Sequence, residues 1–341
     1  MAVLLSHLWA VPVPGWLAVQ GFFVLSGLLM ARIMAETYRS GVKGAGLFLL
    51  NRALRLLPFG VYAVAWGALA VGLTGEVASH AFDSAMSMPD TVSGWAANFL
   101  MIYPSMFPAS LEPRLSPPSW SLTVELLFYA LIAAGLAGSR WRVRLWLAGS
   151  VAFVALAFAL GLEGRWHYSS LPGASLPFAV GAGLHFYLRD TGGRGWLAKL
   201  PAEWLVSAVI VNAVLCSAVA AGPVFFAGFY ANIVLQTALL AIMFGKGKAV
   251  DVSKNALGTR LGEFSYPIYL LHMPLGLLFA TAGLPLRETT WMGLGGGVLV
   301  LGTSMLAAWP VLWASARWID PLRARVRLRA RKGLHRAPAL P

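Results

Sequence analysis

Long apolar segments constrain the fold of this chain more than any other feature of its sequence. A helix needs about 20 mainly apolar residues to cross a bilayer. Nine segments meet that requirement, at roughly 15–34, 56–74, 119–138, 145–162, 171–188, 204–221, 224–244, 264–283 and 291–314. A shorter apolar segment, MAVLLSHLWAVPV, opens the chain. The segments are continuous rather than alternating, which favours helices over strands. We therefore expect an all-α integral membrane protein, a bundle of about ten transmembrane helices.

The composition excludes a water-soluble fold. Charged residues make up 11% of the 341 residues, less than half of the roughly 25% that soluble domains carry. Too little polar surface exists to cover such a fold. The single cysteine, Cys216, also excludes a disulfide framework and a cysteine-based metal cluster.

The basic residues predict how the chain threads the membrane. With ten spans and both termini in the cytoplasm, 23 of the 26 Lys and Arg residues fall on the inner side, and only Arg114, Arg165 and Arg287 fall outside. This is the distribution that the positive-inside rule requires. The net charge of +13 therefore indicates contact with anionic lipid and not with nucleic acid. We expect a multi-pass protein of the bacterial inner (cytoplasmic) membrane, with a transmembrane domain at 1–316 and a basic cytoplasmic tail at 317–341.

One long outer connection stands apart. Residues 75–118 contain the apolar segment WAANFLMIYPSMF (95–107), which is too short to span and fits a re-entrant or interfacial helix. Its rings Trp95, Tyr103 and Phe107 are candidates for stacking on sugar faces, although aromatic residues also gather at bilayer interfaces without such a role.

Few ionisable residues lie inside the predicted spans, and these are the first candidates for a site. A charge at mid-bilayer costs about 2.5–3.5 kcal/mol on insertion scales, so it usually faces a cavity or a partner. Glu125 shares one helix face with Ser121 and Tyr129 by i−4 and i+4 spacing. It is either a catalytic group or a hydrogen-bonding hub between helices.

Histidines supply the second group of candidates. His272 continues a polar stripe of Ser265 and Tyr269 on an otherwise apolar helix, which indicates a cavity-facing side chain. His7, near the outer end of the first span, can take and return a proton. His185 lies near the inner interface and is interpreted as structural. The spacing of His80, His167 and His335 gives no metal-binding signature.

An arginine pair stands at the inner end of the third predicted span. Arg52 and Arg55, in NRALRLLPFG, share a helix face by i+3 spacing and could grip phosphate oxygens. The alternative is that they only set the topology.

Four sequence blocks together resemble the membrane-bound acyltransferase family 3, the group of O-antigen and exopolysaccharide O-acetylases. The blocks occur in the family's order and are GWLAVQGFFVLSGLLM (15–30), NRALRLLP (51–58), PSWSLTVELLFYAL (118–131) and LGEFSYPIYLLHMPL (261–275). A weaker match, ARWIDPLRAR (316–325), is similar to the family's acidic-Pro ending of the last span.

The resemblance implies about ten spans and transfer of an acyl group, most often acetyl, from cytoplasmic acyl-CoA to a carbohydrate hydroxyl. Acyl-CoA would be a co-substrate, with no bound cofactor and no metal. His7 corresponds to the catalytic histidine, and Arg52 and Arg55 match the donor-side arginines. Other motif positions are matched by Ser26, Trp120, Ser121, Glu125, Tyr129, Ser265, Tyr269 and His272.

One departure from the family pattern concerns the start of the chain. The family usually has an arginine about eleven residues before its first-span histidine, and only six residues precede His7. Either the start codon has been placed too late or the protein is a shortened member of the family. The short first span favours a late start codon.

These residues give a mechanistic hypothesis. An alcohol is a poor nucleophile until a base removes its proton, and His7 is the expected base. Glu125 or His272 would orient it, and a group near Ser26 would polarise the thioester carbonyl. The acceptor would be a lipid-linked or surface polysaccharide, or else a small hydrophobic molecule such as a macrolide. A transporter or flippase is the non-enzymatic alternative, but it predicts paired inverted repeats, which the sequence does not show.

Overall fold

The computed structural model describes residues 2–8, 15–38, 41–103, 113–162, 164–219, 222–245, 256–286 and 291–334. Within these ranges the protein is almost entirely helical and contains no strand, so the expected all-α fold is confirmed. The α-helices are α1 (Ala2–Leu8), α2 (Gly15–Ile33), α3 (Val42–Thr74), α4 (Glu76–Phe82), α5 (Val92–Leu100), α6 (Trp120–Ala133), α7 (Arg140–Ala159), α8 (Gly164–Tyr168), α9 (Leu171–Asp190), α10 (Ala202–Ala218), α11 (Pro223–Phe244), α12 (Ala256–Thr281), α13 (Trp291–Ala314) and α14 (Asp320–Leu334). Short π-helical segments extend α2 (η1, Met34–Tyr38) and α13 (η5, Ser315–Ile319).

Several helices are long and apolar enough to cross a membrane. Among the described residues six segments qualify: Gly15–Tyr38, Val42–Thr74, Arg140–Ala159, Pro223–Phe244, Arg260–Thr281 and Met292–Arg331. Helix α10 is apolar but shorter. The chain is therefore a multi-pass membrane protein, while ten spans and cytoplasmic termini remain predictions from the sequence.

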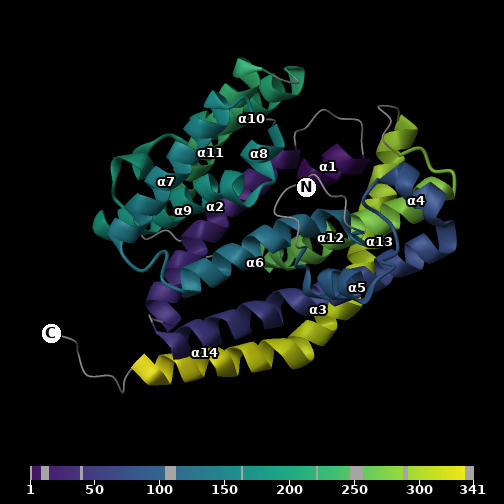
Figure 1. The fold of residues 1–341 in the computed structure, drawn as a ribbon, viewed down its shortest axis with the longest axis horizontal. Coiled ribbons are helices and arrows are strands. Elements are labelled where there is room, and N and C mark those ends of the chain that lie inside the picture. The colour runs from purple at the N-terminus through teal and green to yellow at the C-terminus, as the bar shows by residue number, and fades with distance from the viewer. Residues whose placement is uncertain are drawn as a thin grey trace.

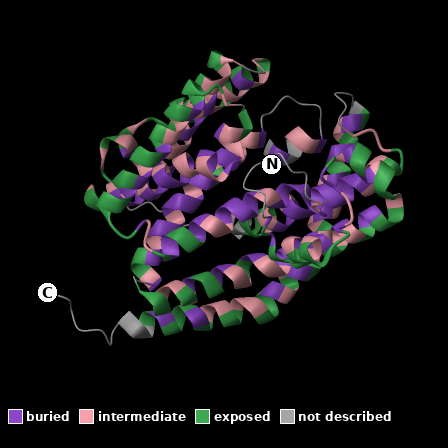
Figure 2. Ribbon diagram, viewed as in Figure 1, coloured by how far each residue is buried: buried purple, intermediate pink, exposed green. Residues whose placement is uncertain are grey.

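Helix α6 is shorter than the span expected at 119–138. It has 14 residues and is about 21 Å long at 1.5 Å per residue, against roughly 30 Å of hydrocarbon. Pro117 and Pro118 lie just before it, and Gly135 turns the chain after it with φ 100°. Most of α6 is buried (Figure 2), so protein rather than lipid surrounds this short helix.

Two other elements contain more helix than the sequence suggested. Helix α3 begins at Val42, well before the span expected from residue 56, and α14 prolongs the last span through η5 into the basic tail. The two run side by side in Figure 1. The Asn51 side chain donates a hydrogen bond to the Arg323 carbonyl at 3.0 Å and joins them.

The helices form two groups with α2 and α6 between them (Figure 1). Helices α7, α9, α10 and α11 make one group, and α3, α12, α13 and α14 make the other. Helices α2 and α9 are in close contact, because Gly181 packs directly on the Val24 carbonyl. The Phe178 ring stacks on Phe23 and Phe128, with centroids 5.1 and 4.5 Å apart. This core holds α6 in a fixed position between the two groups.

Candidate functional site

Two histidines from opposite ends of the chain meet between α1 and α12. His7 Nδ1 lies 2.9 Å from His272 Nε2, and the rings stack with centroids 5.2 Å apart. His272 is fully buried. One turn further along α12, Gly276 faces Leu8, and a Cβ atom there would lie 3.1 Å from the leucine side chain. A bare glycine therefore lets α1 approach closely enough for the histidines to touch.

The hydrogen bonds assign the protons of this pair. His272 Nδ1 lies 3.2 Å from the Ile268 carbonyl oxygen, which can only accept, so Nδ1 carries the proton. In a neutral imidazole the other nitrogen is then an acceptor. His272 Nε2 therefore accepts from His7 Nδ1, and the basic lone pair of His7 lies on its Nε2. This inferred tautomer is the one that a general base requires.

Glu125 lies in a separate buried cluster. Its Oε1 accepts hydrogen bonds from the Ser26 hydroxyl at 3.1 Å and from the Tyr129 hydroxyl, while Oε2 has no partner among the described residues. The bond from Tyr129 fits the expected helix face. Ser121 does not, because its hydroxyl bonds to Pro118 and to Tyr269 instead. Since Ser26 donates its proton to Glu125, its hydroxyl is not set up to polarise a thioester.

The histidine pair and Glu125 occupy different depths. Gly15, at the start of α2, contacts Ser6 beside His7. Ser26, the partner of Glu125, comes 11 residues later on α2, which is about 16 Å along the helix axis. The hydrogen bonds recorded for Glu125 accordingly include neither histidine. Of the two groups expected to orient His7, the structure places His272 there.

Arg52 and Arg55 have different surroundings despite their spacing. Arg52 is 6% exposed, and its guanidinium donates to Asn51 Oδ1 at 3.0 Å and lies 3.7 Å from Met30 Sδ. Arg55 is exposed. No carboxylate within the described ranges forms an ion pair with Arg52, and its Nε has no partner there. The two arginines do not form a matched fork.

Three buried polar atoms without partners gather near Arg52. They belong to Tyr38, Arg52 and Glu125. The Phe48 ring links them, since it lies 5.6 Å from the Tyr38 ring, 5.8 Å from the Arg52 guanidinium and 6.1 Å from the Tyr129 ring. Buried polar groups are almost always satisfied by protein, water or a ligand, so this Arg52–Glu125 cluster has the unused hydrogen-bonding capacity of a binding site. The sequence analysis did not predict Tyr38 and Phe48, because neither belongs to a recognisable motif.

The remaining candidates are placed as follows. Trp120 packs edge-on against Phe23 and Tyr168. Ser265 donates to the Gly262 carbonyl at 2.7 Å on the exposed side of α12. Tyr103 is buried and its hydroxyl lies 2.8 Å from that of Ser119, so it supports the loop and does not offer a free ring to a sugar. Phe107 lies outside the described residues.

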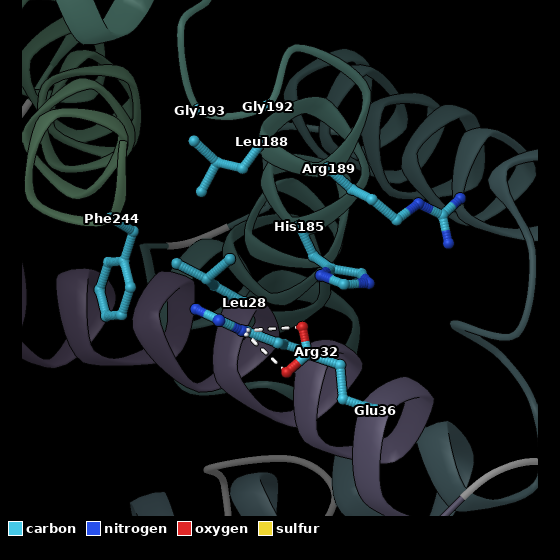
Figure 3. A pocket seen from close by; sticks show the side chains of 9 residues that line it. All are labelled: Leu28, Arg32, Glu36, His185, Leu188, Arg189, Gly192, Gly193 and Phe244. Atoms are coloured by element: carbon cyan, nitrogen blue, oxygen red, sulfur yellow. Dashed lines mark hydrogen bonds and ion pairs between the residues drawn. The ribbon is translucent and has the colours of Figure 1, made fainter. Parts of the chain in front are cut away.

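Two further histidines lie apart from the pair. His185 lines a pocket of about 220 Å³ where α2, α9 and α11 end. Arg32 also lines it, and Arg32 Nε donates to both carboxylate oxygens of Glu36 at 3.0 and 3.1 Å (Figure 3). His167, on α8, lies 2.6 Å from the Tyr230 hydroxyl through Nδ1. Neither is hydrogen-bonded to His7 or His272.

These features define a multi-pass helical membrane protein with a buried histidine pair and a buried arginine–carboxylate cluster. A family model described as an acyltransferase domain matches residues 4–313, nearly the whole chain. The chain belongs to acyltransferase family 3, as the four sequence blocks indicated. No curated protein and no solved structure matches it.

Proposed function

We propose that this acyltransferase moves an acyl group from cytoplasmic acyl-CoA to a hydroxyl of a carbohydrate acceptor at the inner membrane of a bacterial cell. The observation that carries the proposal is the 2.9 Å contact between His7 and His272. It leaves His7 in the tautomer of a general base inside a domain whose family transfers acyl groups.

During the transfer, His7 carries one proton from the acceptor hydroxyl to the CoA thiolate. His7 Nε2 takes the proton of the acceptor hydroxyl while the hydroxyl oxygen attacks the thioester carbonyl. The carbon–sulfur bond then breaks, and the CoA thiolate receives the proton back from His7. His272 positions the ring and stabilises the imidazolium by accepting from His7 Nδ1. A positioned base of this kind typically contributes 10²–10⁴-fold.

The Arg52–Glu125 cluster supplies a site for the donor. A buried guanidinium without a carboxylate partner is costly, and a CoA phosphate would provide the missing anion through charge-assisted hydrogen bonds. Arg55, being exposed, can reach a second phosphate from the aqueous side. In this proposal the donor phosphates bind about 16 Å from the histidine pair, measured along α2.

Acceptor-dependent release of CoA by the purified protein in lipid nanodiscs tests the proposal. Acetyl-CoA is offered with lipid-linked glycans, soluble glycans and hydrophobic alcohols. His7→Gln should lower the rate by about 10²–10⁴-fold. His80→Gln is the matched control, because His80 is exposed on α4, and it should leave the rate unchanged. A fully active His7→Gln would refute the assignment, and uptake of glycan into vesicles without acyl-CoA would favour a transporter.

A further inference from the structure

A cavity of about 200 Å³ lies between four helices beside the histidine pair. Five lining residues are apolar, and the other four carry hydroxyl groups: Ser121, Ser265, Tyr266 and Tyr269. The Ser121 and Tyr269 hydroxyls lie 2.8 Å apart. The apolar lining residues are Val3 of α1, Ala18, Val19 and Phe22 of α2, and Leu122 of α6.

The cavity is one helical turn from the reacting groups. Val3 precedes His7 by four residues on α1, and Tyr269 precedes His272 by three on α12, so each histidine shares a helix face with a lining residue. The Tyr269 and His272 rings have centroids 6.2 Å apart. A group whose carbonyl carbon reacts next to His7 can therefore extend its tail into this cavity.

We propose that this cavity is a subsite for the acyl chain of the donor, and that the chain is longer than acetyl. The inference rests on the proposed acyl transfer and adds the class of acyl group. Apolar walls from three helices suit a hydrocarbon chain, and the four hydroxyls of the lining are already hydrogen-bonded within the protein. Phe22 and Ser265 are exposed at the edge of the cavity, which leaves a lateral opening towards lipid.

The size of the cavity favours a medium chain. At about 30 Å³ for each non-hydrogen atom, the share of a water molecule in the liquid, the tail beyond the carbonyl group fills roughly 30 Å³ for acetyl and roughly 150 Å³ for hexanoyl. Acetyl would thus leave most of the cavity empty, whereas the hexanoyl tail would fill about three quarters of it. Each buried methylene strengthens binding by about fourfold, so the preference over acetyl should reach at least tenfold.

The test compares thioesters of increasing chain length. CoA release is measured with acetyl-, butyryl-, hexanoyl- and octanoyl-CoA for the wild type and for Ala18→Phe, which fills the cavity. Ala152→Phe is the matched control, because Ala152 is exposed on α7 away from the site. The wild type should prefer hexanoyl over acetyl at least tenfold. Ala18→Phe should lower that ratio at least tenfold, and Ala152→Phe should leave it unchanged.

A photoreactive hexanoyl-CoA gives a second readout that does not need turnover. Its label should fall on residues 18–22 or on Leu122, and excess hexanoyl-CoA should compete with it. Labelling at these residues without CoA release supports the subsite and refutes the proposed transfer. Preference for acetyl in the wild type, together with label elsewhere, overturns the subsite and leaves the transfer standing. A third outcome is labelling at these residues that is displaced by phospholipid but not by hexanoyl-CoA. This result would assign the cavity to a bilayer lipid tail and overturn the inference.

Discussion

His7 Nδ1 and His272 Nε2 lie 2.9 Å apart although 265 positions separate them in the chain. A neutral, fully buried imidazole thus holds the place that a carboxylate has in many catalytic triads. The contact to the Ile268 carbonyl fixes which nitrogen of His272 accepts. A neutral partner orients His7 without burying a second formal charge in a low-dielectric region, where an unpaired charge is costly.

The orienting role of His272 predicts different effects for two substitutions. His272→Gln keeps an acceptor for His7 Nδ1, whereas His272→Leu removes that acceptor. We expect kcat to fall about 5- to 150-fold in His272→Leu, the equivalent of roughly 1–3 kcal/mol, with recovery in His272→Gln and little change in KM for the donor. Equal kcat in wild type and His272→Leu would remove His272 from the mechanism.

The isolation of Arg52 predicts a trade between stability and donor binding. Arg52→Met replaces a buried guanidinium, whose hydrogen-bond partners among the described residues are Asn51 and Met30, by an apolar chain of similar length. Burying a charge without an ionic partner is costly, so the thermal midpoint should stay or rise. The KM for acyl-CoA should rise about 10- to 150-fold, the value of a charge-assisted hydrogen bond of roughly 1.5–3 kcal/mol.

Arg55→Met is the comparison for this prediction. Arg55 is exposed, so its replacement should not stabilise the fold and should change KM less than the replacement of Arg52. A thermal midpoint that falls in Arg52→Met with no change in KM would show that Arg52 only supports the structure.

The sequence predicted the individual candidates better than their grouping. Burial cost singled out His7, Glu125, His185 and His272, because isolated ionisable residues stand out in apolar segments, and the family resemblance gave His7 its expected catalytic role. Which of them meet depends on the packing of helices distant in sequence, which helical spacing does not encode. Ser121 illustrates this, since it shares a face with Glu125 yet bonds to Tyr269 of α12.

Helix ends show a second limit of the sequence reading. Hydropathy locates apolar segments but does not register helix that continues into water, so the start of α3 at Val42 and the extension through α14 were not predicted. Hydropathy also overestimated the length of α6, because its apolar residues are buried by neighbouring helices and not by lipid. Tyr38 was missed because its position near Arg52 arises only when η1 packs beside α3.

Glu125 is predicted to support both structure and donor binding. Glu125→Gln retains an oxygen that accepts from Ser26 and Tyr129, while Glu125→Ala leaves both hydroxyls buried without an acceptor. Each unsatisfied hydroxyl costs about 1–3 kcal/mol, so Glu125→Ala should have the lower thermal midpoint. Glu125→Gln should fold normally. Its KM for acyl-CoA should change, because an amide that donates replaces Oε2, which has no partner among the described residues; an unchanged KM would make Glu125 a structural hub only.

His167 predicts a stability that depends on pH. Burial lowers the pKa of His167 from its ordinary 6.5, and a hydrogen bond to the Leu162 backbone opposes this only in part. As the pH falls below 6.5, the unfolded chain takes up a proton that the folded protein does not, so the free energy of unfolding decreases. The thermal midpoint should fall between about pH 7.5 and about pH 5, and the fall should be smaller in His167→Gln. The exposed His80→Gln variant should behave like the wild type.

The contact of α2 with α9 predicts a large effect of a single methyl group. A Cβ atom on Gly181 would collide with the Val24 carbonyl, and one on Gly27 would collide with the Phe178 carbonyl. Backbone cannot move aside as a flexible side chain can, so Gly181→Ala must push the helices apart and strain the core in which Phe178 stacks on Phe23 and Phe128.

Gly149→Ala is the matched control, because nothing lies within 4 Å of its Cβ position on α7. At this position the higher helix propensity of alanine should stabilise the protein by about 0.5–1 kcal/mol. In thermal unfolding experiments in nanodiscs, Gly181→Ala should lower the unfolding temperature and Gly149→Ala should raise it. The activity of Gly181→Ala should also fall, because α6 would no longer hold Glu125 against Ser26. If both variants unfold at the wild-type temperature, the close contact between these helices does not contribute to the stability of the fold.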